Sequence, residues 1–287
     1  MRRVILKTIV SGEYELPYVL LNLLELDSIC DEFWITEANR TITGEEKVFN
    51  FLPFFEKYVQ GRFPKAKFIP IDISHDVKVW NDSNSSDEDL RWNEFLIRSR
   101  FIDFVKLPGN RDIVISVDGD EVIYNSIFLR MILFLLKLWP FREPIAFLLT
   151  LRQFMFYLNL YMSEYEFYSP TIAHFQFYLR QNAPQWRGGG RRIKRPLGGH
   201  FSWVMTPEEM QYKILNYGHR DRLKHLANLA TLKSIKSGNY GLLEPNRKFG
   251  PTQIKSHRHK NLPKSLWNVK LFIKRDVILG NERFWLK

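Results

Sequence analysis

The sequence predicts an α/β protein, a single domain in which helices flank a mixed central sheet. In the first 125 residues, runs rich in β-branched residues alternate with segments whose apolar residues recur at helical spacing. This alternation favours a parallel sheet with flanking helices. The 287 residues, 45% of them hydrophobic, are also enough to bury a substantial core.

Each element of this first half has its own signal. Residues 4–10 form a β-branched run that stops at Ser11-Gly12, so we expect a strand followed by a turn. Residues 16–26 place Leu and Val at helical spacing and predict the first helix. The same reasoning predicts the elements that follow: strands at 32–37 and 67–73, with an aromatic helix at 51–58 between them.

A polar, turn-rich stretch at 82–89 precedes a predicted helix at 90–105. Ser and Asp side chains accept hydrogen bonds from free helix N–H groups, so this stretch is expected to be a loop and a helix cap. Residues 112–117 then form a buried strand that runs directly into Asp118-Gly119-Asp120-Glu121. Acidic residues at the carboxyl end of a central strand lie where open α/β sheets bind ligands.

The pattern changes near residue 125. Beyond it the chain has mixed, aromatic-rich segments such as 154–161, and the Gly- and Arg-rich stretch 187–192 predicts a mobile loop. We therefore expect a nucleotide-binding half, 1–125, and a second half, 126–287, that shapes an acceptor site. The two halves are expected to share one core.

Composition narrows the classes of protein. The net charge of +11 fits an anionic ligand, an anionic polymer or an anionic membrane surface and does not choose among them. Cys30 is the only cysteine, which excludes an intrachain disulfide, a cysteine-rich zinc site and an iron–sulfur site. The ordered interleaving of basic and aromatic residues that is diagnostic of nucleic-acid modules is absent, so we expect no nucleic-acid partner.

The most apolar region, 127–162, is interrupted by charged residues and prolines. We therefore expect no transmembrane span, while peripheral membrane contact stays open. Near the N-terminus, Lys7, Glu13 and Glu15 interrupt the apolar stretch that a signal peptide needs. These observations, with the lone cysteine, lead us to expect a cytoplasmic protein.

The acidic residues after the strand at 112–117 are the sharpest local signal. Asp118 and Asp120 lie two residues apart and could jointly face a hard divalent cation, which would neutralise a diphosphate. Gly119 between them lets the backbone approach a ligand closely. A solvated turn is the alternative for so short a motif.

Four blocks of the sequence are similar to blocks of a known family and occur in the same order. The first two are Gly12-Glu13-Tyr14-Glu15-Leu16 with Glu25-Leu26, and 31–41 with Thr43-Gly44. The other two are Ser116-Val117-Asp118-Gly119-Asp120-Glu121, and Gly198-Gly199-His200-Phe201-Ser202-Trp203 with Thr206-Pro207-Glu208. On these blocks the chain resembles glycosyltransferase family 17, the group that contains the bisecting β-1,4-mannosyl-glycoprotein N-acetylglucosaminyltransferase. Two positions differ: Gly199 stands where the family usually has Trp, and Val122-Ile123 where it usually has Ile-Pro.

The resemblance implies a GT-A-like, Rossmann-type nucleotide-sugar-binding fold, with the donor held by 1–125 and the acceptor by 126–287. It implies a glycosyltransferase that depends on Mn²⁺ or Mg²⁺ and moves a sugar from a UDP-sugar to a glycan or glycoconjugate acceptor. The family-based expectation is N-acetylglucosamine, transferred with inversion into a β linkage. UDP-xylose, UDP-glucose and UDP-galactose stay open as donors, since each differs by only one or two polar contacts.

The resemblance also implies roles for particular residues. Asp120 would bind the metal directly, and Asp118 would hold ribose or a metal-bound water. His200 could offer a neutral imidazole to the cation or the diphosphate, or it could bond a backbone carbonyl. Asp118, Asp120 and His200 are therefore the candidates for both the catalytic site and the metal site.

The ends of the first two predicted strands add binding candidates. Val10, Ser11 and Glu37 lie where backbone and carboxylate groups could read uracil and ribose, although Glu37 could instead be a helix-start acid. On the helix that follows, Arg91 is a candidate for phosphate, as is Arg98 seven residues later on the same face. No general base is singled out among the acids of the second half, which are Glu164, Glu166, Glu208 and Glu209.

Two other classes of function stay open. One is a non-catalytic basic module that binds nucleic acid or acidic polysaccharide, in which the two aspartates form only a turn. The other is a metal-dependent phosphohydrolase or nucleotidyltransferase that uses the same carboxylates. Such an enzyme would release phosphate or pyrophosphate, whereas sugar transfer releases UDP.

Overall fold

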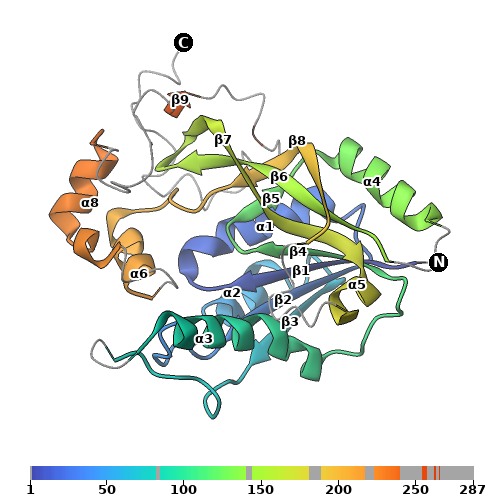
Figure 1. Ribbon diagram of the computed structural model, residues 1–287, viewed down its shortest axis with the longest axis horizontal. Helices are drawn as coiled ribbons and strands as arrows, with labels where there is room; N and C mark the ends of the chain where they lie inside the picture. Colours follow the sequence, from blue (N-terminus) through green and yellow to red (C-terminus); the bar gives the residue numbers. More distant parts are fainter. Residues whose placement is uncertain are drawn as a thin grey trace.

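The computed structural model describes residues 2–81, 85–139, 144–180, 189–216, 223–239 and 254–256, together with residues 262 and 265. Within these residues the chain builds one mixed sheet of nine strands with helices packed around it (Figure 1). Strands from both halves of the chain belong to this sheet. The prediction of an α/β protein with a mixed central sheet is thereby confirmed.

The first half of the chain forms the parallel part of the sheet, in the order β3-β2-β1-β4. Its strands are β1 (Val4–Val10), β2 (Glu32–Ala38), β3 (Ala66–Ile71) and β4 (Ile113–Asp118). All seven residues of β1 are buried, because β1 lies inside the sheet and is covered on both faces. The predicted strands agree with these bounds to within about two residues, the usual uncertainty at element ends.

Helices cover the two faces of this parallel part. Leu6 and Val10 of β1 pack with α1 (Leu16–Leu26), α2 (Phe51–Tyr58) and α4 (Ser126–Leu138) in one apolar cluster. Ile5 and Ile9 point the other way and pack with α3 (Asp87–Ser99), η2 (Arg100–Phe104) and α5 (Phe175–Arg180). Alternation along β1 thus supplies both cores, as a strand's period of two requires.

The helix predicted at 90–105 begins three residues earlier, at Asp87, and its last turns are the separate 3-10 helix η2. The Asp89 carboxylate accepts a hydrogen bond from the Ser86 backbone N–H at 2.9 Å, which fixes this start in the manner of a capping box. The predicted cap is therefore confirmed at Ser86 and Asp89, while residues 82–84 of the polar stretch lie outside the described residues.

The second half extends the sheet in the order β4-β7-β6-β8-β5, with β9 beside β7. These strands are β5 (Glu121–Ile123), β6 (Ala146–Met155), β7 (Tyr157–His174), β8 (Arg191–His200) and β9 (Ile254–Ser256). The pair β6–β8 is parallel, and every other pairing in this part is antiparallel.

The prediction of a mobile loop at 187–192 is wrong for its last two residues. Arg191 and Arg192 begin β8 and pair with Phe147 and Leu148 of β6, so backbone hydrogen bonding holds them in the sheet. Residues 187 and 188 lie outside the described part of the chain.

Two further helices, α6 (Pro207–Asn216) and α8 (Leu229–Lys236), lie together at one end of the molecule (Figure 1). Short 3-10 helices precede α1 and α8, at Glu13–Glu15 (η1) and Lys224–Leu226 (η3). In the part of the chain that is described, no helix has both the length and the apolar character needed to cross a bilayer.

Candidate functional site

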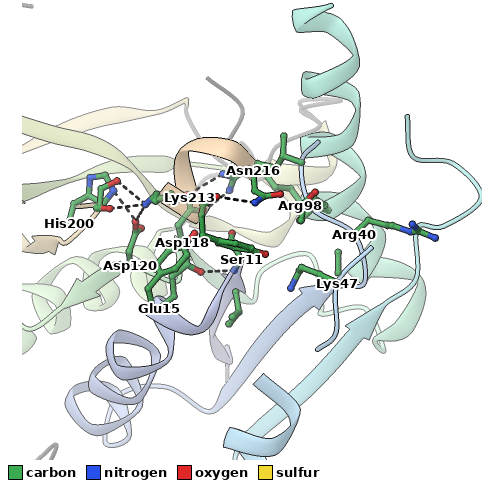
Figure 2. A pocket seen from close by; sticks show the side chains of 18 of the residues that line it. Ser11, Glu15, Arg40, Lys47, Arg98, Asp118, Asp120, His200, Lys213 and Asn216 are labelled. Atoms are coloured by element: carbon green, nitrogen blue, oxygen red, sulfur yellow. Dashed lines mark hydrogen bonds and ion pairs between the residues drawn. The ribbon is translucent and has the colours of Figure 1, made fainter. Parts of the chain in front are cut away.

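A pocket opens where β1 and β4 end (Figure 2). Its volume is about 780 Å³ when space open to solvent is counted. Segments far apart in the sequence line it, so residues of both halves meet here. Its acidic, basic and imidazole side chains are Glu15, Arg40, Lys47, Arg98, Asp118, Asp120, His200 and Lys213.

Asp118 is the last residue of β4 and is held by an arginine of α3. Arg98 donates hydrogen bonds to both Asp118 carboxylate oxygens, at 2.6 and 3.1 Å, and to Glu94 at 2.9 Å. Such a two-point contact fixes both position and orientation. Arg98 is 9% exposed, so the pair is largely shielded from water.

Arg91 is not brought to the pocket, although it shares a helix face with Arg98. It is exposed and does not line the pocket. Seven residues along a helix correspond to about 10 Å of rise, which separates the two side chains along the axis of α3. The phosphate role predicted for Arg91 therefore has no support in the geometry.

Asp120 lies in the turn between β4 and β5 and is 4% exposed. Its Oδ2 accepts a hydrogen bond from Lys213 Nζ at 2.8 Å, and its Oδ1 lies 3.5 Å from His200 Nε2 (Figure 2). Burial alone would raise the pKa of Asp120, but the Lys213 ammonium and then His200 hold it well below its usual range. Asp120 is therefore a carboxylate at neutral pH.

His200 reaches Asp120 because β8 pairs with β5. The antiparallel register places His200 opposite Glu121, the residue after Asp120. Gln153 Oε1, which can only accept, lies 2.7 Å from His200 Nδ1, so that nitrogen carries a hydrogen. The Nε2 atom on the other side of the ring faces Asp120 Oδ1. The partner of the ring is thus a side-chain amide and not the backbone carbonyl that the sequence left open.

Lys213, on α6, lines the pocket but is not among the residues that the sequence singles out. Its ammonium donates to Asp120 Oδ2 at 2.8 Å, to the Ser202 carbonyl at 2.9 Å and to Ser202 Oγ at 3.0 Å. It also lies over the rings of Tyr14 and Trp203, at 5.3 and 5.7 Å from their centroids. No local signal marks Lys213 among the chain's 42 basic residues, because its partners are distant in the sequence.

Val10 and Ser11 line the pocket, as predicted from the end of β1. The Ser11 N–H donates to Glu15 Oε2 at 2.6 Å, and burial, followed by the nearby Asp120, raises the pKa of Glu15 well above its usual value. A Cβ atom at Gly119 would collide with this carboxylate and approach the Ile9 carbonyl to 2.7 Å. Glycine is needed there because the acidic turn packs directly against the end of β1.

Glu37 is not brought to the pocket. Its fully buried carboxylate accepts hydrogen bonds from the N–H groups of Asn50 and Phe51, at 3.0 and 2.8 Å, and forms an ion pair with Lys47. These N–H groups begin α2, so Glu37 is the helix-start acid that the sequence left as the alternative to a uracil-reading role.

The acids considered as a general base do not line the pocket where their side chains are described. Glu166 pairs with Arg192 at 2.7 Å, and Glu209 accepts the Thr206 N–H at 2.9 Å, which caps α6. Glu208 lies on the exposed side of the same helix, and the side chain of Glu164 is outside the described set.

Gly199 replaces the tryptophan expected from the family resemblance. A Cβ atom there would lie 2.7 Å from the ring of Phe154 and 2.8 Å from that of Phe201. Position 199 therefore faces the apolar core beneath β8, where a larger side chain has no room in this chain.

A group of three side chains has the donor atoms of a cation site. One ligand atom from each of Asp120, Glu121 and His200 lies within 4.8 Å of the others. Glu121 is fully buried and accepts the Asp118 N–H at 2.7 Å. Two carboxylates and an imidazole suit Mn²⁺, and Asp120 can engage Lys213 through Oδ2 while Oδ1 faces His200. These residues fit a divalent cation. The predicted metal candidates are Asp118, Asp120 and His200, and in this group Glu121 stands instead of Asp118.

Comparison with known proteins adds to this geometry. Residues 1–238 match the family model of glycosyltransferase family 17, a range that includes every residue lining the pocket. A search of curated proteins gave no match. Because the family model covers more than half of the 287 residues, the chain belongs to glycosyltransferase family 17.

Proposed function

We propose that this glycosyltransferase moves a sugar from a UDP-sugar to a glycan or glycoconjugate acceptor, with a divalent cation in the pocket at the end of β4. Family membership supports glycosyl transfer. The observation that carries the rest is the cluster of Asp120, Glu121 and His200, of which Asp120 and His200 line a pocket formed by both halves of the chain. This position, beyond the carboxyl ends of parallel strands, also supports a GT-A-like, Rossmann-type fold.

The cation, Mn²⁺ or Mg²⁺, would be held by Asp120, Glu121 and His200. When bound, it stabilises the negative charge that develops on the departing UDP. The chain's own contribution is to hold these ligands in place. Lys213 fixes Asp120, and Gln153 fixes the ring of His200, through the contacts described above.

The basic side chains around the pocket favour the proposal that the leaving group is a doubly charged diphosphate. Arg40 and Lys47 lie on the opposite side of the pocket from His200 (Figure 2). Among the described residues, the buried Arg40 Nε has no hydrogen-bond partner, so it is available as a donor to an anion. Cations placed where negative charge develops lower the barrier to bond cleavage.

The first half supplies Asp118, Val10 and Ser11, and we propose that they bind the nucleoside. Asp118 lines the pocket and Arg98 orients its carboxylate, so a ribose hydroxyl or a cation-bound water would meet it there as an acceptor. His200 and Lys213 come from the second half, so the proposed division at residue 125 separates donor from acceptor surfaces only in part. The acceptor would approach over the second half.

The family supports UDP-N-acetylglucosamine as the donor, and inversion to a β linkage as the outcome. UDP-xylose, UDP-glucose and UDP-galactose are the alternatives within the same chemistry. A panel of these four donors, each assayed for UDP release with a glycan acceptor, distinguishes them. The donor with the highest kcat/KM identifies the transferred sugar.

The same assay tests the reaction class through Asp120→Asn. We expect UDP release to require Mn²⁺ or Mg²⁺ and to fall by at least about a hundredfold in this variant, because the leaving-group charge loses its support. His200→Ala should lose less. Asp87→Asn, at an exposed position on α3, is the matched control and should keep full activity.

Two results would contradict the proposal. Wild-type turnover by Asp120→Asn in excess Mn²⁺ would remove the cation from the mechanism. Release of pyrophosphate or phosphate in place of UDP would indicate a nucleotidyltransferase or phosphohydrolase.

A further inference from the structure

Helix α4 has two apolar faces, and in the described part of the chain only one of them is covered. The inner face packs into the core through Leu129, Ile132, Leu133 and Leu136, each at most 5% exposed. The outer face carries five large apolar side chains that are more than half exposed: Ile127 (77%), Met131 (57%), Phe134 (62%), Leu135 (58%) and Leu138 (61%). No other described helix or strand has as many exposed large apolar side chains.

These five side chains form one continuous stripe. Their positions follow the pattern i, i+4, i+7, i+8 and i+11, which on a helix of 3.6 residues per turn confines them to an arc of about 100°. The stripe lies directly opposite the buried face. An exposed apolar patch of this kind, confined to one face, is typical of an interaction surface and not of scattered surface hydrophobics.

Basic side chains border the stripe on both edges. Arg130 and Lys137 of α4 are exposed and lie along one edge, four residues before and three residues after Phe134. On the other edge, Arg195 of β8 places its guanidinium 5.3 Å from the centre of the Phe128 ring. Figure 1 shows α4 next to β8 at the periphery of the molecule. Helix α4 itself contains no acidic residue.

From this arrangement we infer that the outer face of α4 docks on an anionic lipid bilayer. An apolar stripe bordered by Lys and Arg is the pattern of helices that lie in the membrane interface, with apolar side chains at the acyl boundary and basic ones among anionic headgroups. Because the inner face of α4 is packed on the sheet, the helix would lie along the bilayer surface. The chain's net charge of +11 favours the same partner.

Charge argues against a second copy of the chain as the occupant. A two-fold contact through this stripe would bring the basic side chains of both copies, Arg130, Lys137 and Arg195 in each, to the same interface, and like charges at an interface oppose association. Anionic headgroups would instead neutralise these side chains. No residue of α4 lines the pocket, so a membrane-bound molecule would keep its proposed active site open.

The experiment is co-sedimentation of the full chain with phosphatidylcholine vesicles, with and without phosphatidylserine. We expect binding to the vesicles that contain phosphatidylserine, weakening as salt is added. The variant Phe134→Ser/Leu138→Ser should lower the partition coefficient at least about tenfold, since it removes two apolar side chains from the stripe. Lys137→Glu should also weaken binding and reduce its dependence on salt.

A matched control is Phe104→Ser/Leu107→Ser, which changes the same residue types at comparable exposure, 56% and 49%, away from α4. It should bind vesicles like the wild type. Circular dichroism checks that each variant folds. If Phe134→Ser/Leu138→Ser does not fold, the vesicle binding of Lys137→Glu tests the inference in its place.

The inference is overturned if the wild type binds neither vesicle, if it binds neutral vesicles as strongly as anionic ones, or if the control loses as much binding as the α4 variant. It is also overturned if light scattering shows a dimer that Phe134→Ser/Leu138→Ser converts to a monomer, because the stripe would then join two copies of the chain.

Discussion

Replacing Lys213 with Met would leave the Asp120 carboxylate buried without its ammonium partner. The side chains of Asp120 and Lys213 are 5% and 4% exposed, and their charged atoms are 2.8 Å apart. Met keeps most of the volume and apolar stem of Lys, so it removes the charge and three hydrogen bonds with little change in packing. The variant therefore isolates the electrostatic role of Lys213.

Breaking a buried ion pair by removing one partner costs about 3–5 kcal/mol, because the remaining charge stays desolvated. Asp120 can limit this loss by binding a proton, so we expect about 3 kcal/mol at pH 7. The double variant Lys213→Met/Asp120→Asn should recover part of it, since no unpaired charge is then buried. Lys233→Met, whose side chain is 63% exposed, is the control and should change stability by less than about 0.5 kcal/mol.

The pH dependence gives a second readout with a definite sign. In the wild type the pKa of folded Asp120 is lowered, so its contribution is complete above the unfolded value near 4 and is lost only as pH falls further. Between pH 7 and pH 5 it adds no slope. In Lys213→Met, burial raises the pKa of folded Asp120, so the folded state takes up a proton first and the variant regains stability as pH falls from 7 to 5.

The assay is urea unfolding, followed by circular dichroism, at pH 7 and pH 5 in the presence of EDTA. The reasoning is refuted if Lys213→Met loses no more stability than Lys233→Met. It is also refuted if the cost of Lys213→Met is the same at both pH values, because Asp120 would then not be the group that responds.

Three further results are expected. Arg98→Lys should lower the free energy of unfolding by about 1–3 kcal/mol in urea, because an ammonium cannot make the two-point contact to Asp118; an unchanged midpoint would contradict this. Burial raises the pKa of the Cys30 thiol to about 12, so a disulfide reagent at pH 8 should label it only after unfolding, and rapid labelling of the folded protein would show that the thiol is accessible. Burial lowers the pKa of His174 below 6.5, so the unfolded state binds the proton first and stability should fall as pH drops below about 6.5. His174→Gln should flatten that fall, and an equally steep loss would assign it to another group.

The elements of the first half could be predicted from local patterns, for a physical reason. Strands buried on both faces give continuous apolar runs, and amphipathic helices give a period of 3.6, so each element has a signal within its own residues. Helices α1 and α2 accordingly span the predicted residues. The second half has weaker signals because β6 and β7 bend and shift register, which breaks simple alternation.

Residues of the site could be predicted where they lie at or just after the end of a strand that is itself recognisable in the sequence, as do Val10, Ser11, Asp118 and Asp120. It was not predictable where the partner comes from a distant segment. Lys213 and Gln153 reach the site only because α6 and β6 are folded against it, and no spacing along the chain encodes those contacts.

Glu37 shows the opposite error. It stands at a strand end with the right chemistry, yet the start of α2 takes up its carboxylate. An acid at the end of a strand can face either a bound ligand or the start of the next helix. Which of the two it faces depends on the path of the loop that follows, and the residues near Glu37 do not specify that path.

The most direct test of the proposed active site is anomalous diffraction from crystals grown with Mn²⁺ and UDP. We predict a manganese peak within ligand distance of Asp120 and His200, with the diphosphate beside it in the pocket. A peak elsewhere in the molecule, or UDP bound in the pocket with no manganese at Asp120, would contradict the proposal.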